Sequence, residues 1–307
     1  MNRRSLLKSG LTALAGAALR CPPRAAFAAE ALSVTPVADG IVVIAGAGGN
    51  VVAKATAQGH VLVDSGAEAA GNALLAALGG LPGGERVGTL FNTHWHREQV
   101  GSNAALGRAG ATIVAHEKTR QRLAVGYYVP AEDRYEKPLP PEALPTETFY
   151  TRGETVAGGE RIEHGYLLEA HTDGDIYVFF RDANVMAVGG AVSPVRDPEL
   201  DWFGGGWIGG RVDALAMLLE ISDAETRFVP SYGPVIGRAE VQAEHDLMLT
   251  LFERTVELLR KGYSAEDMLA AGVMDGLGRQ FDDPLAFLDA AHRSLWAHHN
   301  TLSHDIV

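Results

Sequence analysis

Cysteine is almost absent from this chain, whose 307 residues contain only Cys21. A single cysteine excludes an internal disulfide framework and any metal site built from several thiolates. Cys21 itself falls in an N-terminal segment with the composition of a cleaved signal. We therefore expect a mature chain without disulfides, in which a bound metal ion would have nitrogen or oxygen ligands.

Positive charge is also scarce. The 26 Lys and Arg stand against 38 Asp and Glu, a formal net charge of −12. Residues 1–28 contain five basic groups and no acidic ones, so the charge of residues 29–307 becomes −17. Such a chain repels phosphate backbones, which argues against nucleic acid as a partner. Beyond the N-terminal segment no run of about 18 apolar residues lacks charge, so we expect no membrane span.

The N-terminal segment has the pattern of an export signal. A basic head precedes an apolar stretch, and Ala26-x-Ala28 offers a cleavage site. Arg3 and Arg4, in the string RRSLLK, are typical of a twin-arginine signal, although an ordinary signal peptide could carry two arginines by chance. We expect cleavage after residue 28 and a periplasmic or secreted protein.

Strand and helix patterns fill the rest of the chain. Residues 32–66 contain four short β-rich runs separated by turns, which predicts antiparallel strands. Helix-like and apolar segments then alternate up to residue 124, and a second β-rich half spans residues 147–190. Two β-rich halves, each with helices, indicate two sheets packed face to face between helical layers. We expect one domain over residues 29–238 and a helical extension over 239–307 packed on it.

Two segments are expected to be loops. Residues 127–146 are rich in proline and charge, which predicts a long loop that is either a functional lid or a surface insertion. The string DWFGGGWIGG, residues 201–210, has the composition of a flexible pocket wall with Trp202, Phe203 and Trp207 as apolar contacts. The alternative is a packed loop whose glycines allow tight turns.

The segment NTHWHREQVGSN, residues 92–103, carries the strongest functional signal. In an extended backbone His94 and His96 point to the same side, so both imidazoles can reach one cation. His171, in the string EAHTDGDIYVFF, ends a predicted strand and is the third candidate. Imidazole suits zinc, and three protein ligands with one open position are typical of a catalytic zinc site.

These segments resemble the metallo-β-lactamase superfamily, with its H-x-H-x-D-H motif. HVLVDSG, NTHWHREQVGSN, AHTDGDIYVFF, NVMAVGG and FVPSYGPV each resemble a segment of that family, so the likeness extends over most of the mature chain. The resemblance implies a four-layer αββα sandwich of two mixed sheets flanked by helices, an α/β (α+β) fold. It also implies metal-dependent hydrolysis of a small molecule, and AHTDGD with the helical tail suggests a branch of exported hydrolases.

The family pattern is altered where it would bind a second metal ion. Glu98 stands where the family has Asp, and Gln99 where it has His. Gly190 replaces the bridging Asp, and Tyr232 replaces the last His. The residues that match the first metal site, His94, His96 and His171, are all present. We therefore expect at most one tightly bound ion, a Zn²⁺ on those three histidines.

Roles follow from the chemistry of the altered residues. Glu98 could accept a proton from water, and the Tyr232 phenol could polarise a carbonyl oxygen. The alternatives are a structural carboxylate at Glu98, a vacated site filled by Gln99 and Tyr232, and a histidine cluster without metal. Asp64 is expected to hold a turn. Other histidines are expected to be ordinary core, surface or helix-end residues, namely His60, His116, His164, His245, His292, His298, His299 and His304.

The preferred hypothesis is an exported mono-zinc hydrolase that cleaves a small ester, lactone or amide. The alternative is a lactamase-fold protein that has lost catalysis and binds a ligand or partner. A third is a two-metal enzyme in which Glu98 and an unrecognised residue rebuild the second site. The sequence leaves open the substrate, the hydrolysis of β-lactams and the oligomeric state.

Overall fold

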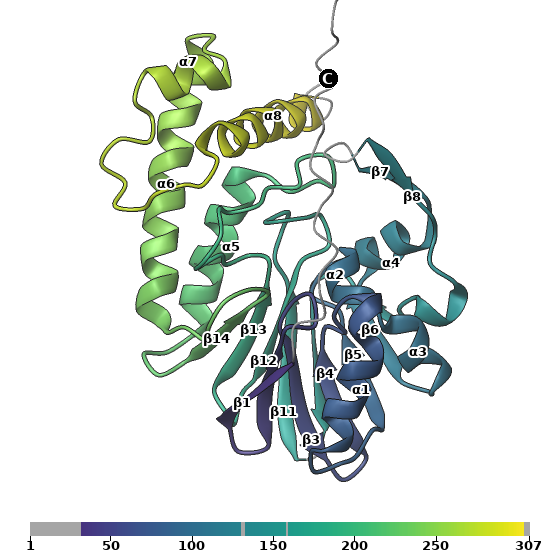
Figure 1. Ribbon diagram of the computed structural model, residues 1–307. Helices are drawn as coiled ribbons and strands as arrows, with labels where there is room; N and C mark the ends of the chain where they lie inside the picture. Colours follow the sequence, from purple (N-terminus) through teal and green to yellow (C-terminus); the bar gives the residue numbers. More distant parts are fainter. Residues whose placement is uncertain (1–31, 130–132, 158, 304–307) are drawn as a thin grey trace, which may run out of the picture.

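The computed structural model describes residues 32–129, 133–157 and 159–303. In these ranges two mixed β-sheets pack face to face, and helices cover both outer faces (Figure 1). The predicted four-layer αββα sandwich is confirmed. The predicted export signal, with Cys21, lies outside the described residues. None of the helices in the described ranges is long and apolar enough to cross a membrane.

The first sheet has seven strands in the order β1-β2-β3-β4-β5-β6-β9. The first four strands are antiparallel, as predicted, whereas β4–β5, β5–β6 and β6–β9 pair in parallel. The bounds are β1 (Ser33–Ala38), β2 (Ile41–Ala45), β3 (Val51–Thr56), β4 (Gly59–Val63), β5 (Val87–Phe91), β6 (Thr112–His116) and β9 (Glu147–Phe149).

The second sheet has five strands in sequence order, β10 (Arg152–Ala157), β11 (Glu160–Tyr166), β12 (Ile176–Phe180), β13 (Val185–Gly189) and β14 (Arg227–Pro230). The sequence placed Glu147–Phe149 in this second half, and that is wrong. This segment pairs in parallel with β6 and so extends the first sheet, because β6 would otherwise be an open edge. Apolar side chains such as Phe91, Val178 and Val229 fill the interface between the sheets.

Four helices follow strands of the first half, α1 (Gly71–Gly79), α2 (Arg97–Val100), α3 (Asn103–Arg108) and α4 (Glu117–Ala124). Leu74 and Leu78 of α1 pack against the outer face of the first sheet. Helices α2 and α3 are two short helices with a break between them. A Cβ atom on Gly101 would lie 2.1 Å from the backbone nitrogen of Glu68, in the 3₁₀ turn η1 (Glu68–Ala70). The glycine permits this close approach at the break between the two helices.

The sequence predicts a long loop over residues 127–146, and this prediction is wrong for part of the segment. It contains a hairpin of β7 (Tyr127–Val129) and β8 (Arg134–Glu136), followed by the 3₁₀ turn η3 (Pro141–Ala143). Tyr128 and Tyr135 lie opposite each other on the two strands, with ring centroids 5.1 Å apart. Such a cross-strand aromatic pair stabilises a short hairpin, and the prolines begin only after it.

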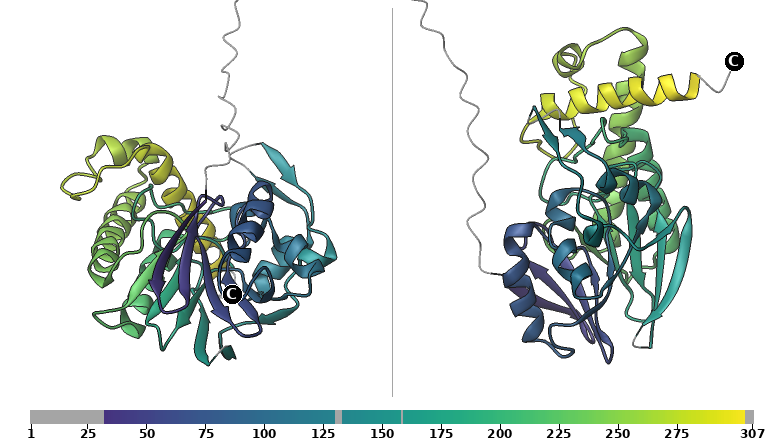
Figure 2. Two further views of the ribbon diagram at one scale, coloured as in Figure 1. Left: turned by 60° about the horizontal axis from the view of Figure 1, so that its bottom comes forward. Right: turned by 90° about the vertical axis from the view of Figure 1, so that its right-hand side faces the viewer.

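The outer face of the second sheet is covered by α5 (Ile208–Ile221) and α6 (Arg238–Arg260) (Figure 2). Helices α7 (Ala265–Ala270) and α8 (Pro284–Ser303) lie beyond the end of the sheet, at the upper end of α6 in Figure 1. Leu215 of α5, Leu251 of α6 and Leu288 of α8 belong to one continuous apolar core with Met186 and Phe228 of the sheet. The helices expected over residues 239–307 are therefore present in the described part of that range.

Candidate metal centre

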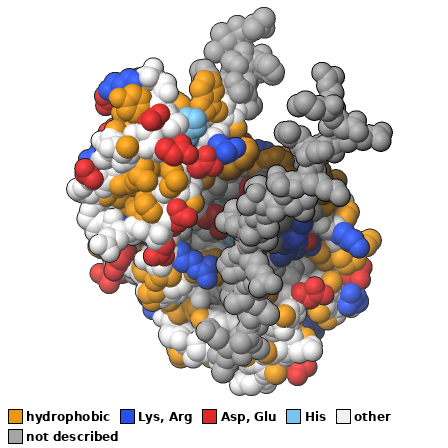
Figure 3. Space-filling view, turned by 45° about the horizontal axis from the view of Figure 1, so that its top comes forward, with side chains coloured by type: hydrophobic (Ala, Val, Ile, Leu, Met, Phe, Trp, Pro, Cys, Tyr) orange, Lys and Arg blue, Asp and Glu red, His pale blue; other side chains and the backbone are white. Residues whose placement is uncertain are grey.

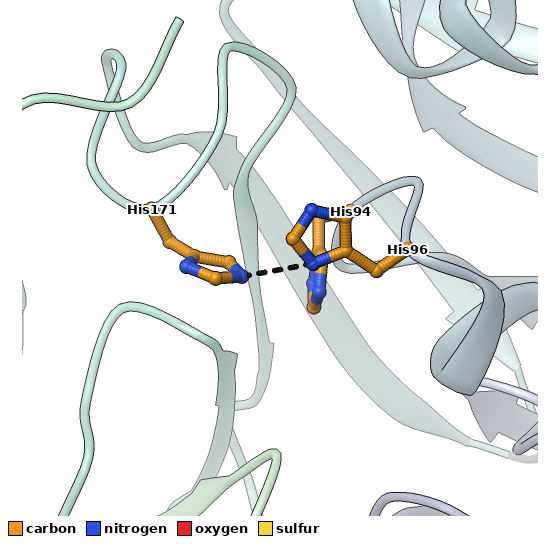
Figure 4. Close-up of side chains that lie close together, drawn as sticks. All are labelled: His94, His96 and His171. Atoms are coloured by element: carbon orange, nitrogen blue, oxygen red, sulfur yellow. Dashed lines mark hydrogen bonds between the residues drawn. The ribbon is translucent and has the colours of Figure 1, made fainter. Parts of the chain in front are cut away.

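Three imidazoles converge at one end of the sandwich (Figure 4). His94 and His96 follow β5, and His171 lies in the loop between β11 and β12. One ligand atom from each ring lies within 4.8 Å of the others, and the ring centroids are 4.8–4.9 Å apart. His94 and His171 are buried, and His96 is partly exposed. The predicted convergence of these three histidines, from two distant parts of the chain, is confirmed.

The nitrogen atoms that face one another are spaced as a metal ion requires. Nδ1 of His96 lies 3.2 Å from Nε2 of His171. Two nitrogens that each form a bond of about 2.0–2.1 Å in a tetrahedral zinc site are separated by roughly 3.3 Å. The pair therefore fits one shared cation without rearrangement.

The opposite nitrogen of each ring is held by a neighbour. Nε2 of His96 lies 3.0 Å from Oδ2 of Asp201, and Nδ1 of His171 lies 3.0 Å from the carbonyl oxygen of Glu199. Both acceptors require an N–H on that side of the ring, so in the neutral form of each ring the lone pair belongs to the nitrogen that faces the cluster. Such outer contacts orient metal-binding histidines and fix their tautomers.

A chain of contacts from Asp64 orients His94 in the same way. Asp64 has φ +63° and accepts hydrogen bonds from the backbone N–H of Thr93 at 2.8 Å and from its hydroxyl at 2.7 Å. Because the Thr93 hydroxyl donates to Asp64, it can only accept from Nδ1 of His94, 3.0 Å away. Asp64 thus holds the loop, as predicted, and takes no place in the cluster. Burial raises its pKa to about 7, although the bonds from Thr93 lower it.

The pKa values of His94 and His96 are shifted in opposite directions. Burial lowers the pKa of His94 well below its usual range, and the neighbouring His171 and His96 lower it further. Burial also lowers the pKa of His96, but the hydrogen bond to Asp201 and the charges of Glu199, Asp201 and Glu98 outweigh this and raise it to about 9. A metal ion that binds here therefore finds His94 neutral and must displace a proton from His96.

The residues expected at the second metal position are arranged around Gln99. Its buried side chain hydrogen-bonds His94, and its Nε2 lies 3.5 Å from the hydroxyl oxygen of Tyr232. Tyr232 therefore reaches the cluster through Gln99. Glu98 is partly exposed, on the first turn of α2, and its charge acts on His96 and Tyr232. In the part of the chain that the structure describes, the only group of residues suited to hold a metal is the three histidines.

Gly190 lies directly against a ligand. A Cβ atom on Gly190 would lie 2.3 Å from Cδ2 of His171 and 2.8 Å from its Nε2. Any side chain at this position would therefore collide with the imidazole in its present place. Gly206 is comparable, since its Cβ would lie 2.0 Å from the carbonyl oxygen of His171. The glycines at both positions allow the chain to close around this histidine.

The glycine-dense segment, residues 201–210, was expected to be either a pocket wall or a packed loop. Its first part is exposed and its last part is packed. Phe203 is exposed and Trp202 is partly exposed, on a turn whose Gly204 N–H donates to Asp201. Trp207, in contrast, precedes α5 and stacks on His298 of α8, with ring centroids 3.6 Å apart. Trp207 is thus a packing residue and does not line the site.

No sequence pattern indicated three residues that lie near the site. Asp201, which contacts His96, stands in the glycine-dense segment, and its type was the only signal for it. Arg211 is fully buried and pairs with Glu244 of α6 at 2.7 Å. Glu244 occupies a position on the apolar face of α6 between Val241 and Leu247, where a charged residue needs a partner.

Comparisons with known proteins agree with this site. The family model described as metallo-beta-lactamase superfamily matches residues 46–239, which is more than half of the chain. A search of curated proteins returned no match.

Solved structures share the fold at low sequence identity. A metallo-beta-lactamase from Pontibacter korlensis is 22% identical with a TM-score of 0.56, over 71% of this chain and 99% of that one. The DIM-1 metallo-beta-lactamase is 17% identical with a TM-score of 0.56, over 72% and 98%. The sec-alkylsulfatase Pisa1 from Pseudomonas sp. is 12% identical with a TM-score of 0.64; this match covers 87% of this chain but only 50% of that protein. The chain belongs to the metallo-β-lactamase superfamily.

Proposed function

We propose that the protein is a hydrolase that uses one zinc ion, held by His94, His96 and His171, to cleave a small ester, lactone or amide. The observation that carries the proposal is the convergence of three imidazoles, each with its other nitrogen engaged. The three rings direct one nitrogen each at a common point, which is how imidazole ligands surround a single zinc ion. All three ligands are neutral when bound, so zinc keeps its full charge and supplies Lewis acidity and an acidified water molecule.

The chain's own residues supply orientation and proton transfer. Asp201, Thr93 and the carbonyl of Glu199 hold the imidazoles. Glu98, whose charge acts on His96, would accept a proton from water. Burial raises the pKa of Tyr232, despite the hydrogen bond from Gln99, so the phenol stays protonated and can donate to a substrate oxygen.

A single metal ion follows from the residues beside the histidines. Gln99 is a neutral amide, Tyr232 is a protonated phenol, and Gly190 has no room for a bridging carboxylate. None of these groups is a good zinc ligand. The same replacements favour the second candidate, a ligand-binding protein without catalysis.

Metal content and turnover test the two candidates together. Wild-type protein purified without added zinc should contain about one equivalent and hydrolyse at least one member of a panel of chromogenic esters, lactones and β-lactams. His94→Ala and His171→Ala should lose both the metal and the activity, whereas His245→Ala, on the outer part of α6, should retain both. Less than about half an equivalent of metal, with turnover that chelator does not change, would reject the hydrolase. Metal binding without turnover on the panel would favour the ligand-binding candidate.

Export through the twin-arginine route is part of the proposal and rests on residues 1–28. Arg3→Lys combined with Arg4→Lys should leave the protein in the cytoplasm, as fractionation would show. Unchanged export would indicate an ordinary signal peptide.

A further inference from the structure

We propose that Arg122 of α4 is a positioning residue for the metal centre, which fixes the loop of His171 against the loop of His96. The inference rests on the metal site of the proposed function and assigns a role to a residue that is not itself a ligand. Its basis is one guanidinium that contacts both ligand loops. The guanidinium binds Asp173, two residues after His171, and lies over the ring of Trp95, which directly precedes His96.

The loop that carries His171 is held together from within. The backbone N–H of Leu167 donates to the carbonyl oxygen of Asp175 at 2.9 Å, which closes the loop between β11 and β12. The buried carboxylate of Asp175 accepts from the backbone N–H of His171 at 2.5 Å. At the base of the loop, the N–H of Ile176 donates to the carbonyl oxygen of Thr93 at 2.8 Å. These bonds fix the shape and the base of the loop, and its outer part is anchored by other contacts.

Helix α4 supplies two of these anchors, one on each side of His171. Nζ of Lys118 lies 3.1 Å from Oε1 of Glu169, two residues before the ligand. The buried hydroxyl of Thr119 donates to the carbonyl oxygen of Gly174 at 3.0 Å, three residues after it. Two successive side chains of α4 therefore hold the loop on either side of the imidazole.

Arg122 adds a third anchor from the same helix, a fork on one carboxylate. Its Nη2 lies 2.7 Å and its Nε 3.1 Å from Oδ2 of Asp173, and Nε also lies 3.3 Å from Oδ1. The backbone N–H of Asp173 donates to the carbonyl oxygen of Gly204 at 2.9 Å, so the glycine-dense segment is tied to the same point. A forked contact restricts direction as well as distance, so Arg122 determines where the outer part of the loop lies relative to α4.

The same guanidinium contacts the segment of the first two ligands. Its carbon lies 5.5 Å from the centroid of the Trp95 ring, which is buried. Trp95 stands between His94 and His96 in the chain, and its ring meets that of His96 edge-on at a centroid distance of 4.7 Å. A cation is attracted to the face of an indole. Arg122 thus links the two ligand loops through one side chain.

The positive charge of Arg122 is compensated within the protein. Asp173 lies 2.7 Å away, and both side chains are partly buried. On the face shown in Figure 3, the described Lys and Arg side chains are dispersed among acidic and apolar ones and do not gather into one basic patch. A paired guanidinium has little net charge to attract an anion, so the contacts of Arg122 favour positioning over ligand recognition.

Zinc affinity and cobalt spectra test this role. Zinc affinity, measured by chelator competition above about pH 9, where His96 is already neutral, should fall by about tenfold or more in Arg122→Gln. The visible absorption spectrum of the protein saturated with Co²⁺ should also change, because it depends on the arrangement of the ligands. A merely structural role would leave the spectrum of the folded, loaded protein as in wild type. Arg122→Lys keeps the charge but not the planar fork and should recover only part of the affinity.

Two further variants test the pair and its specificity. Asp173→Asn should resemble Arg122→Gln, and the double variant should bind zinc no more weakly than either single variant, because the two side chains act as one unit. Arg120→Gln is the matched control on the same helix, since Arg120 is exposed and its Nε donates to the carbonyl oxygen of Pro145 at 3.1 Å. Its zinc affinity and cobalt spectrum should equal those of wild type.

Three results would overturn the positioning role: wild-type zinc affinity in Arg122→Gln, a loss of affinity with an unchanged cobalt spectrum, or a wild-type protein that binds neither metal. Zinc binding without turnover, together with both effects of Arg122→Gln, would reject the proposed hydrolase and keep the positioning role. Zinc-dependent turnover with an affinity that Arg122→Gln leaves unchanged would do the reverse.

Discussion

The carboxylate of Glu244 reaches from α6 into the interior, where its Oε1 lies 2.7 Å from Nη2 of the fully buried Arg211. The other end of the same guanidinium donates to the carbonyl oxygens of Gly190 at 2.9 Å and Glu199 at 3.3 Å. The carbonyl of Glu199 also accepts from His171. A helix distant in sequence from the histidines is thus connected to one of them through a single ion pair.

Glu244→Gln is therefore expected to affect both stability and metal binding. Removing one partner of a buried ion pair leaves an uncompensated charge and costs about 3–5 kcal/mol of unfolding free energy. Zinc affinity should fall by about tenfold or more, because the loop that orients His171 loosens. Denaturant unfolding and chelator competition measure the two effects.

Glu163→Gln is the control for this prediction, since Glu163 pairs with Arg181 at 2.7 Å but is partly exposed. A partly exposed pair contributes little, so both quantities should stay within about 1 kcal/mol of wild type. An equal loss of zinc affinity in the two variants would show that Glu244 has no special connection to the site.

Asp201→Asn tests the orientation of His96. The amide keeps an oxygen for the N–H of Gly204 but loses the negative charge that attracts the imidazole. Zinc affinity, measured by chelator competition above about pH 9, where His96 is already neutral, should drop by roughly 10–100-fold. Asp182→Asn, at the far end of the second sheet, should leave it unchanged. Unaltered zinc affinity in Asp201→Asn would contradict the role assigned to this carboxylate.

The sequence predicted the parts of the site that are local in the chain. His94 and His96 are two residues apart after an apolar strand, and His171 stands in a string that resembles the same family. Asp201 could not be predicted, because its contact with His96 spans 105 residues and depends on how two loops meet. Arg211 and Glu244 likewise become partners only once α5 and α6 pack together.

In the fold, too, the sequence predicted the local features and missed those that depend on distant contacts. Strands and helices with strong periodicity were predicted, whereas the hairpin of β7 and β8 was missed because strands of three residues leave no alternation to detect. Glu147–Phe149 is equally short, and its pattern does not state which sheet it joins. Sheet membership is decided by the open edge of β6, which only the tertiary structure reveals.

Gly190→Asp should fail to create a second metal site. The new Cβ would lie 2.3 Å from the His171 ring, so the side chain must displace a ligand before its carboxylate can bind anything. We expect less than one equivalent of zinc and a lower affinity, measured by elemental analysis and chelator competition. Gly80→Asp is a control for the added charge, because Gly80 has φ −80° and its Cβ would lie 3.5 Å from the carbonyl oxygen of Ala77, an ordinary contact. Two equivalents of zinc in Gly190→Asp would contradict the proposed single-metal site.

Acid stability should depend on His164, a core histidine outside the site. Its ring lies between Phe91 and Phe149, and burial lowers its pKa to about 4. Below pH 6.5 the unfolded chain binds a proton that the folded protein excludes. The contribution of this neutral ring is thus fully present above about pH 6.5, declines as the pH falls, and is lost by about pH 4. His164→Leu cannot take up that proton, so its unfolding free energy should decline less steeply than that of wild type between pH 6.5 and 4.

Denaturant titrations at several pH values measure the slopes, and His245→Gln should follow wild type. Parallel curves for His164→Leu and wild type would show that the ring is not kept neutral by its surroundings.

Glu98→Gln separates proton transfer from metal binding. The amide has nearly the same shape but cannot accept a proton, so kcat should fall by about 10²–10⁴-fold if Glu98 is the general base. Zinc content should stay at about one equivalent, because Glu98 is not among the residues grouped around the cation. Glu98→Asp, which restores a carboxylate on a shorter side chain, should recover part of the rate and the same acid limb in the pH–rate profile. A Glu98→Gln enzyme with wild-type kcat would assign the carboxylate a structural role, and loss of zinc from that variant would make Glu98 a ligand.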